Sequence, residues 1–470
     1  MQHSMTQNSD RHSLPTTIHL NVRDRNYIIP ETDDPDGLYF PMSLVIGLTL
    51  KVALKPEQLI AAVVEVDRRF PQFRLGYRLD YRNDFWYKVP DGELQEHLKA
   101  MVRHGKAAAL DDLMSASLPA NIVPISQPLE FTLHGNNLVV KAIHAFGDGR
   151  FIMQLIAYIL QAVLEPAIFE RLPALPAHTG IPLWRVVWQS PGQGIGILLT
   201  AAKLLGQTYQ DFKTTPVAGD AHKVFPVIHS GSPMQVVRFT LTAQAMTLLD
   251  EIRNSIQGPN RISLNTLMQV LIAHGLADFG SSVQPTIYTI PVDLKRYLKQ
   301  PDTFYPGNLA SQIRVRQAVR ESFDLAEEAA ALQQEIERQL ADRSPLASLP
   351  MEWLFALGGK KLFRKTNRDW LLNSPKTDPR FFVLTNLGSL DTDWKALLPH
   401  MEGTCGFAVP LMGAPPVVVA FLALGGVGHL TLVYNPLALS AEQAQMLLTT
   451  FGPERLNSLL DTLNDHGSHP

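Results

Sequence analysis

Apolar residues along the chain predict two successive blocks in which strands and helices alternate. In the first block, 38–52 is apolar and β-branched, which is typical of a strand, and 56–70 places apolar residues at helical spacing. The second block repeats this order, with a strand over 236–242, a helix over 262–280 and a strand over 285–294. Strands that alternate with helices twice over predict a chain of α/β or α+β lobes.

Proline marks the region between the two blocks. The chain has 34 prolines, more than the average share of about 5%, and many of them fall between 166 and 235. We interpret this region as stiff corners where the chain passes from one lobe to the next. The predicted organisation is a disordered tail over 1–15, a first lobe over 16–190, a crossover over 191–235 and a second lobe over 236–470.

A predicted hairpin and helix frame the motif that carries chemistry. Strands are predicted over 128–133 and 138–143, because the His-Gly-Asn-Asn sequence at 134–137 has the composition of a tight turn. A strongly apolar helix is predicted from about residue 150 to residue 163. The sequence His-Ala-Phe-Gly-Asp-Gly at 144–149 therefore falls in a loop between a strand and a helix.

The residue types of this loop suit proton transfer. A histidine at a strand end is held rigidly, and an imidazole with a pKa of about 6.5 is matched to acid–base work near neutral pH, so His144 is the candidate catalytic residue. Gly147 and Gly149 allow a sharp turn of the backbone. Asp148 is placed either to cap the following helix or to hold a cationic partner.

The composition narrows the class of protein. The 470 residues carry a formal net charge of −3, so they lack the basic footprint of a nucleic-acid-binding protein. The one cysteine, Cys405, excludes a disulfide framework and a cysteine-rich zinc site within the chain, and it fits a reducing compartment. The histidines form no metal-binding pattern, so we expect no metal site. The sequence has no apolar signal core and no membrane-spanning run, so we expect a cytoplasmic protein.

The spacing His-x-x-x-Asp-Gly at a strand–loop–helix junction resembles the catalytic motif of the chloramphenicol-acetyltransferase-like superfamily. That superfamily includes peptide-synthetase condensation domains, plant BAHD acyltransferases, wax ester synthases and alcohol O-acetyltransferase-like proteins. Further segments resemble it in the expected order: 61–90 (AAVVEVDRRFPQFRLGYRLDYRNDFWYKVP), 263–280 (SLNTLMQVLIAHGLADFG), 288–298 (YTIPVDLKRYL), 305–315 (YPGNLASQIRV) and 381–391 (FFVLTNLGSLD). Together these segments and the motif span roughly 38–440.

Two departures favour the alcohol O-acetyltransferase-like branch. Condensation domains usually carry His-His at the motif, and here the first of the two positions is Ile143. BAHD enzymes carry Asp-Phe-Gly-Trp-Gly near the C-terminus, whereas the Asp-Phe-Gly of this chain lies in mid-chain at 278–280. The resemblance implies two acyltransferase lobes, each a mixed sheet flanked by helices, with a tunnel between them and His144 at its midpoint.

The resemblance also implies a reaction. An acyl group would pass from acyl-CoA, or from the phosphopantetheine of an acyl carrier protein, to the hydroxyl of a small or lipid-like alcohol, with His144 as general base and no permanently bound cofactor. Asp148 would be structural and paired with an arginine, for which Arg74 and Arg296 are the candidates. Thr385, Asn386 or a backbone N–H would stabilise the oxyanion, and two further residues, Gly388 and Asn308, would line the tunnel.

Other interpretations stay open at this stage. The chain suits a stand-alone condensation-type enzyme that forms amides, or a non-catalytic relative that binds acyl chains or carrier proteins. The segment 353–372 mixes apolar and basic residues, so it fits weak contact with a membrane surface as well as packing on the second lobe with a solvated basic face. A chain that holds both lobes needs no partner copy to build the cleft, so we expect a monomer.

Overall fold

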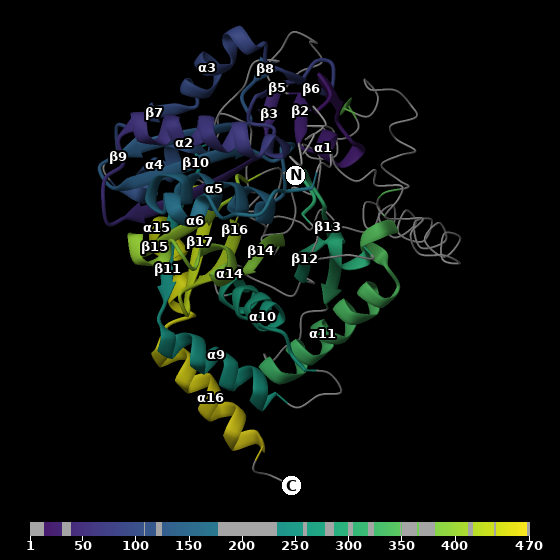
Figure 1. Cartoon of the computed structure of the whole chain (residues 1–470). Helices are drawn as coiled ribbons and strands as arrows, with labels where there is room; N and C mark the ends of the chain where they lie inside the picture. Colours follow the sequence, from purple (N-terminus) through teal and green to yellow (C-terminus); the bar gives the residue numbers. More distant parts are fainter. Residues whose placement is uncertain are drawn as a thin grey trace, which may run out of the picture.

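Two helix-flanked sheets dominate the computed structural model of the chain (Figure 1). The structure describes residues 14–30, 39–107, 109–118, 125–176, 233–256, 261–277, 286–298, 304–317, 324–347, 349, 364–365, 381–411, 417–436 and 439–467. The predicted pair of lobes with mixed sheets and flanking helices is confirmed. Most of the predicted crossover, the Asp-Phe-Gly at 278–280 and all of 353–372 except Arg364 and Lys365 lie outside the described residues.

The first sheet carries the motif. Its strands lie in the order β15-β4-β10-β9-β7, with bounds Met401–Ala408, Ser43–Leu50, Asn137–Ile143, Leu129–His134 and Val102–His104. The hairpin of β9 and β10 has the predicted turn, and β10 pairs antiparallel with β4, so that Ile143 lies opposite Ser43. The last strand before the motif is therefore the central strand of a five-stranded sheet.

Helices hold the first sheet from both sides. α2 (Pro56–Arg69) packs along α5 (Gly149–Leu164), while α4 (Leu110–Ser117) contacts β4, β10 and the second-lobe strand β11 (Gln235–Leu241). α5 is apolar on nearly every side, and ten of its residues are buried, which is typical of a helix enclosed by a core. The helix that follows the motif is thus fixed over most of its length.

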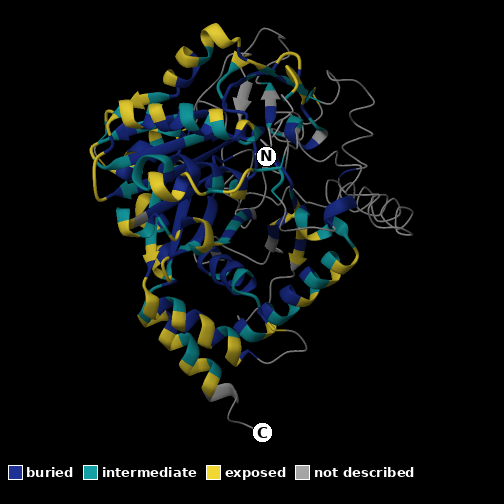
Figure 2. Cartoon of the chain, viewed as in Figure 1, coloured by how far each residue is buried: buried dark blue, intermediate teal, exposed yellow. Residues whose placement is uncertain are grey.

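The second sheet has the order β11-β17-β16-β14-β12-β13. The bounds of its remaining strands are Val427–Tyr434 (β17), Val417–Leu424 (β16), Phe381–Ser389 (β14), Thr286–Asp293 (β12) and Ala310–Gln317 (β13). Its helices are α9 (Ala243–Ser255), α10 (Leu264–Ala277), α11 (Leu325–Ala341), α15 (Ala441–Thr449) and α16 (Pro453–Gly467). Side chains on one face pack with α9 and α10, and those on the other join the core of the first lobe. Both faces are therefore buried (Figure 2).

Several smaller elements accompany the two main sheets. A four-stranded sheet has the order β1-β6-β5-β8, with bounds Thr17–His19, Phe85–Lys88, Tyr77–Asp80 and Ile125–Ser126. A short helix α1 (Val22–Asn26) precedes a ribbon of β2 (Ile28–Pro30) and β3 (Tyr39–Pro41). The short elements that complete the fold are η1 (Pro71–Phe73), α3 (Asp91–Lys99), α6 (Pro166–Phe169), η2 (Leu294–Tyr297), α14 (Asp391–Trp394) and η3 (Leu398–His400).

The strand β15 joins the two lobes. Although it comes from the second half of the sequence, it pairs antiparallel with β4 of the first sheet. It also meets the second sheet, since the N–H of Phe407 donates to Oγ1 of Thr431 on β17 at 3.2 Å. Within the described residues, no helix is long and apolar enough to cross a bilayer.

Replacement of Gly147 by alanine tests how tightly the motif loop is packed. A Cβ at this position would lie 2.1 Å from a ring carbon of Phe151, and aromatic atoms in a core cannot move aside cheaply. We expect Gly147→Ala to lower the free energy of unfolding by about 1–3 kcal/mol, measured by chemical denaturation. The matched control is Gly92→Ala in α3, where a Cβ would meet nothing within 4 Å. Equal stability of the two variants would contradict this account of the loop.

Candidate functional site

The backbone of His144 is fixed by the first sheet. Its N–H donates to the carbonyl of Met42, just before β4, at 2.7 Å. The residue directly follows β10 and is half-buried. The imidazole therefore starts from a rigid strand end, as the sequence analysis expects, and does not sit on a free loop.

Asn308 brings the second lobe to this histidine. Its Nδ2 lies 3.0 Å from His144 Nδ1 and donates to the His144 carbonyl at 3.2 Å. Its Oδ1 accepts from the N–H of Ala310 at 3.0 Å, so the amide is oriented with its NH2 group toward the histidine. Asn308 was expected to line the tunnel, and the structure places it against the catalytic candidate itself.

Tyr27 covers one face of the imidazole. The two rings are stacked, with centroids 3.8 Å apart and planes inclined by 3°. Tyr27 ends α1, in an N-terminal segment that sequence reasoning did not connect with the site. A five-residue helix leaves no periodic pattern to read, so no signal in the sequence pointed to this contact.

The surroundings keep His144 neutral. Burial lowers the pKa of His144 to about 4, and the positive charge of Arg23 acts in the same direction. Ring hydrogen bonds to the backbone of His144 and Gly147, and the negative charge of Asp148, partly offset this lowering of the pKa. At neutral pH the imidazole is therefore uncharged and able to accept a proton.

Asp148 ties the two lobes together through backbone N–H groups. One carboxylate oxygen accepts from the N–H of Phe151 at 2.9 Å and caps α5, as predicted. The other oxygen accepts from the N–H of Leu309 at 3.1 Å. The carboxyl is only 7% exposed, so both bonds are shielded from water and the carboxylate needs no further partner.

Neither candidate arginine pairs with Asp148 within the described part of the chain. Arg74 is buried in a left-handed conformation with a φ of 57°. Its guanidinium donates to the carbonyl of Phe146 at 3.2 Å and lies over the Phe146 ring. Arg296 is exposed and lies over the ring of Tyr297. Arg74 thus supports the motif loop through Phe146 and not through the aspartate.

Gly149 allows the second lobe to approach the motif. A Cβ there would lie 2.7 Å from Leu387 on β14 and 3.2 Å from Phe407 on β15. Together with Gly147, which lies against Phe151, it explains why small residues flank Asp148. Both glycines serve close packing, and neither has the positive φ that sequence reasoning associates with a sharp turn.

The β14 candidates lie on opposite faces of their strand. Asn386 donates to Asn265 of α10 at 3.4 Å and, through its Oδ1, accepts from the N–H of Gly388 at 2.7 Å. It therefore faces the helices of the second lobe. Because side chains alternate along a strand, Thr385 faces the first lobe, as does Leu387, which belongs to the first-lobe core. Gly388 has a φ of 71° and ends the regular pairing.

A buried charge cluster lies beside the histidine. Burial raises the pKa of Asp24 to about 7, although the nearby positive charges of Arg74, Arg23 and Arg25 lower it. Arg23 donates to Oγ of Ser311 on β13 at 3.0 Å. Sequence reasoning named only Arg74 of this cluster, because the others lie in α1 and in the second sheet. Among the described residues, no group of three or more His, Cys, Asp or Glu is placed to hold a metal ion.

Comparison with solved structures shows the fold. The chain is similar to TRI3 trichothecene 15-O-acetyltransferase from Fusarium sporotrichioides, with a TM-score of 0.63, 12% identity, and 94% of this chain and 96% of that chain covered. It is also similar to the epimerization domain of the third module of tyrocidine synthetase B (TM-score 0.56, 13% identity, 96% and 98% covered). A third similar structure is VibH, an NRPS condensation enzyme, with a TM-score of 0.51, 12% identity, and 92% of this chain and 93% of that chain covered.

These likenesses cover nearly the whole chain, which therefore has the fold that the acetyltransferase, the epimerization domain and the condensation enzyme share. No family model and no curated protein matches the sequence. The three structures carry out different reactions on one fold, so the choice among reactions rests on the site itself.

Asp148→Ala tests whether the carboxylate stabilises the fold by binding the two backbone N–H groups. Losing both N–H partners should lower the free energy of unfolding by about 1–3 kcal/mol and remove the activity that depends on His144. Thr242→Ala is the matched control, because Thr242 caps α9 through the N–H of Ala245, away from the site. It should lose comparable stability and keep its activity. An Asp148→Ala variant as stable as the parent would contradict the bridging role.

Proposed function

We propose that the protein is an acyltransferase that moves an acyl group from a thioester to the hydroxyl of an alcohol. The observation that carries this proposal is the setting of His144. The ring is neutral, fixed at a strand end, stacked on Tyr27 and contacted by Asn308 of the other lobe. A binding protein has no need of an uncharged histidine held on three sides, whereas a general base does.

In this proposal Nε2 is the base, so the neutral ring carries its proton on Nδ1, and the Asn308 NH2 group donates to the His144 carbonyl. In the proposed reaction Nε2 takes the proton of the acceptor hydroxyl as the oxygen attacks the thioester carbonyl carbon. The tetrahedral intermediate collapses, the carbon–sulfur bond breaks, and Nε2 returns the proton to the departing thiolate. The products are an ester and a free thiol, and no acyl-enzyme forms.

The register of β14 favours Thr385 as the donor to the oxyanion. Its side chain faces the first lobe, where His144 lies, whereas Asn386 is engaged with α10. A hydroxyl held on a central strand of the sheet is preorganised for a developing negative charge. The co-substrate we propose is acyl-CoA or an acyl carrier protein, and the protein acts as a cytoplasmic monomer.

Replacement of the histidine tests the proposal directly. His144→Ala should lower the rate of thiol release from acyl-CoA in the presence of alcohols by roughly 10²–10⁴-fold, with an unchanged far-UV circular dichroism spectrum. The control is His104→Ala, because His104 is an exposed histidine on β7. Full activity in His144→Ala, or no alcohol-dependent thiol release by the parent, would overturn the proposal.

The pH profile tests the environment of the base. Because burial lowers the pKa of His144 to about 4, the ring stays neutral well below the usual histidine range near 6.5. We expect kcat/KM to stay level from pH 7 to about pH 5 and to fall below that as Nε2 is protonated. Asp24→Asn should keep the same acidic limb, since Asp24 takes no part in proton transfer. A limb near pH 6.5 in the parent would contradict this environment.

A further inference from the structure

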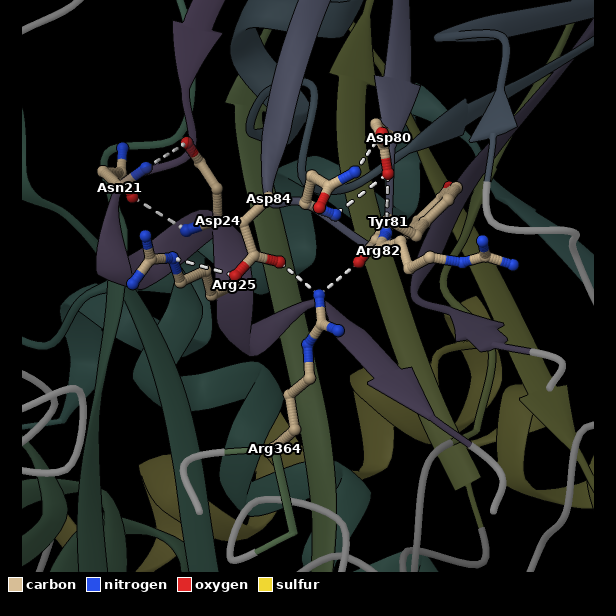
Figure 3. Close-up of polar contacts among 9 residues, drawn as sticks. Asn21, Asp24, Arg25, Asp80, Tyr81, Arg82, Asp84 and Arg364 are labelled. Atoms are coloured by element: carbon tan, nitrogen blue, oxygen red, sulfur yellow. Dashed lines mark hydrogen bonds and ion pairs between the residues drawn. The ribbon is translucent and has the colours of Figure 1, made fainter. Parts of the chain in front are cut away.

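Asp84 is a buried residue outside the motif. It follows the tight turn between β5 and β6, where Oδ1 of Asp80 accepts from the N–H groups of Arg82 and Asn83 at 2.9 Å each (Figure 3). Asp84 is 3% exposed and has a φ of 58°, the left-handed conformation that aspartate tolerates in turns. The carboxylate is thus held in place by the turn and by what it binds.

Two guanidinium groups from distant segments meet on this carboxylate. Nε of Arg25, in α1, lies 3.5 Å from one oxygen. Nη2 of Arg364 contacts the other oxygen and also the carbonyl of Tyr81, and Figure 3 shows both arginines converging on Asp84. Because the carboxylate is buried, removing its charge would leave two cations without their shared partner, which is costly.

The position of α1 depends on such anchors. A helix of five residues is far too short to be stable by itself. Asp84 holds it through Arg25 and through its own carbonyl, which accepts from the N–H of Leu20 at 2.9 Å. At the other end of the helix, Tyr27 stacks on His144. A chain of contacts therefore runs from Arg364 through Asp84 and α1 to the imidazole.

We propose that Asp84, bound by Arg25 and Arg364, is a positioning residue that holds α1 and thereby keeps Tyr27 stacked on His144. The contacts of Asp84 that involve described residues do not include His144, so in this proposal it acts through α1. The part of this proposal that concerns catalysis rests on the proposed function. The part that concerns the imidazole does not.

Side chains from several elements face the His144 ring and influence its pKa. Arg23 comes from α1, Asp148 from the start of α5, Tyr27 from the end of α1 and Asn308 from the loop before β13. If α1 loosens, Tyr27 and Arg23 both leave the ring, and water reaches it. Each of these changes raises the pKa of His144 from about 4 toward its ordinary value.

The experiment is a histidine titration by NMR on the full chain labelled at histidine Cε1, with the His144 signal assigned by its loss in His144→Gln. Asp84→Asn keeps the size of the side chain and removes its charge, and Tyr27→Leu removes the stacked ring. Both should raise the pKa of His144 by at least one unit. Asp342→Asn is the matched control, because Asp342 is exposed and binds Arg338 far from the site.

An unchanged His144 titration in folded Asp84→Asn would overturn the proposal. Should Asp84→Asn fail to fold, Arg25→Gln decides in its place, because this arginine is partly exposed and its loss leaves Asp84 paired with Arg364. A rise in pKa with Tyr27→Leu but none with Arg25→Gln would also overturn it.

Activity gives a second measurement. Asp84→Asn and Tyr27→Leu should each lower kcat about tenfold or more, with KM for the thioester within about twofold. The double variant should be no worse than the more impaired single variant, because both act through one element. Additive losses would contradict the pathway through α1. If the parent transfers no acyl group, the proposed function fails, and the titration still decides whether Asp84 positions the histidine.

Discussion

The carboxylate of Asp148 is the contact on which the rest of the site depends. With one oxygen it caps the helix that follows the motif, and with the other it binds the N–H of Leu309 in the second lobe. Two backbone donors from different lobes share one buried acceptor, so the lobes meet at a fixed distance. Asn308, next to Leu309, is thereby brought against His144. The motif spacing keeps the catalytic candidate four residues from this bridge, at the end of a strand that cannot move.

The local parts of the site could be predicted from the sequence, because they depend on neighbouring residues. The hairpin, the strand end at His144, the cap at Asp148 and the apolar helix α5 all follow from turn composition, capping chemistry and periodicity. Tyr27, Arg23 and Asp84 could not be found in this way, because their importance comes from contacts across the fold. The expected arginine partner of Asp148 was wrong for a related reason. A resemblance suggests an ion pair, whereas here two N–H groups already satisfy the carboxylate, and Arg74 binds the carbonyl of Phe146 instead.

The fold and the chemistry carry different information in this protein. Structures with one architecture include an acetyltransferase, an epimerization domain and a condensation enzyme, so the architecture leaves the reaction open. The uncharged imidazole and its two supports, one from each side of the lobe boundary, are the basis for the proposal that the reaction begins with proton abstraction from an acceptor. Arg364 belongs to the segment 353–372, whose basic residues were expected to face solvent or a membrane surface. This basic side chain points inward to Asp84 and is not offered to solvent or to a membrane.

The path of β15 has a consequence for how the chain is made. On the ribosome, the first-lobe residues emerge early, but β4 has an unpaired edge until residues 401–408 have been synthesised. An open edge with apolar neighbours is prone to pair with other chains. The first sheet is therefore completed only after most of the second lobe has been synthesised. A shortened product that ends before β15 would lack this last strand, and the nascent chain would need protection at β4 until synthesis is nearly complete.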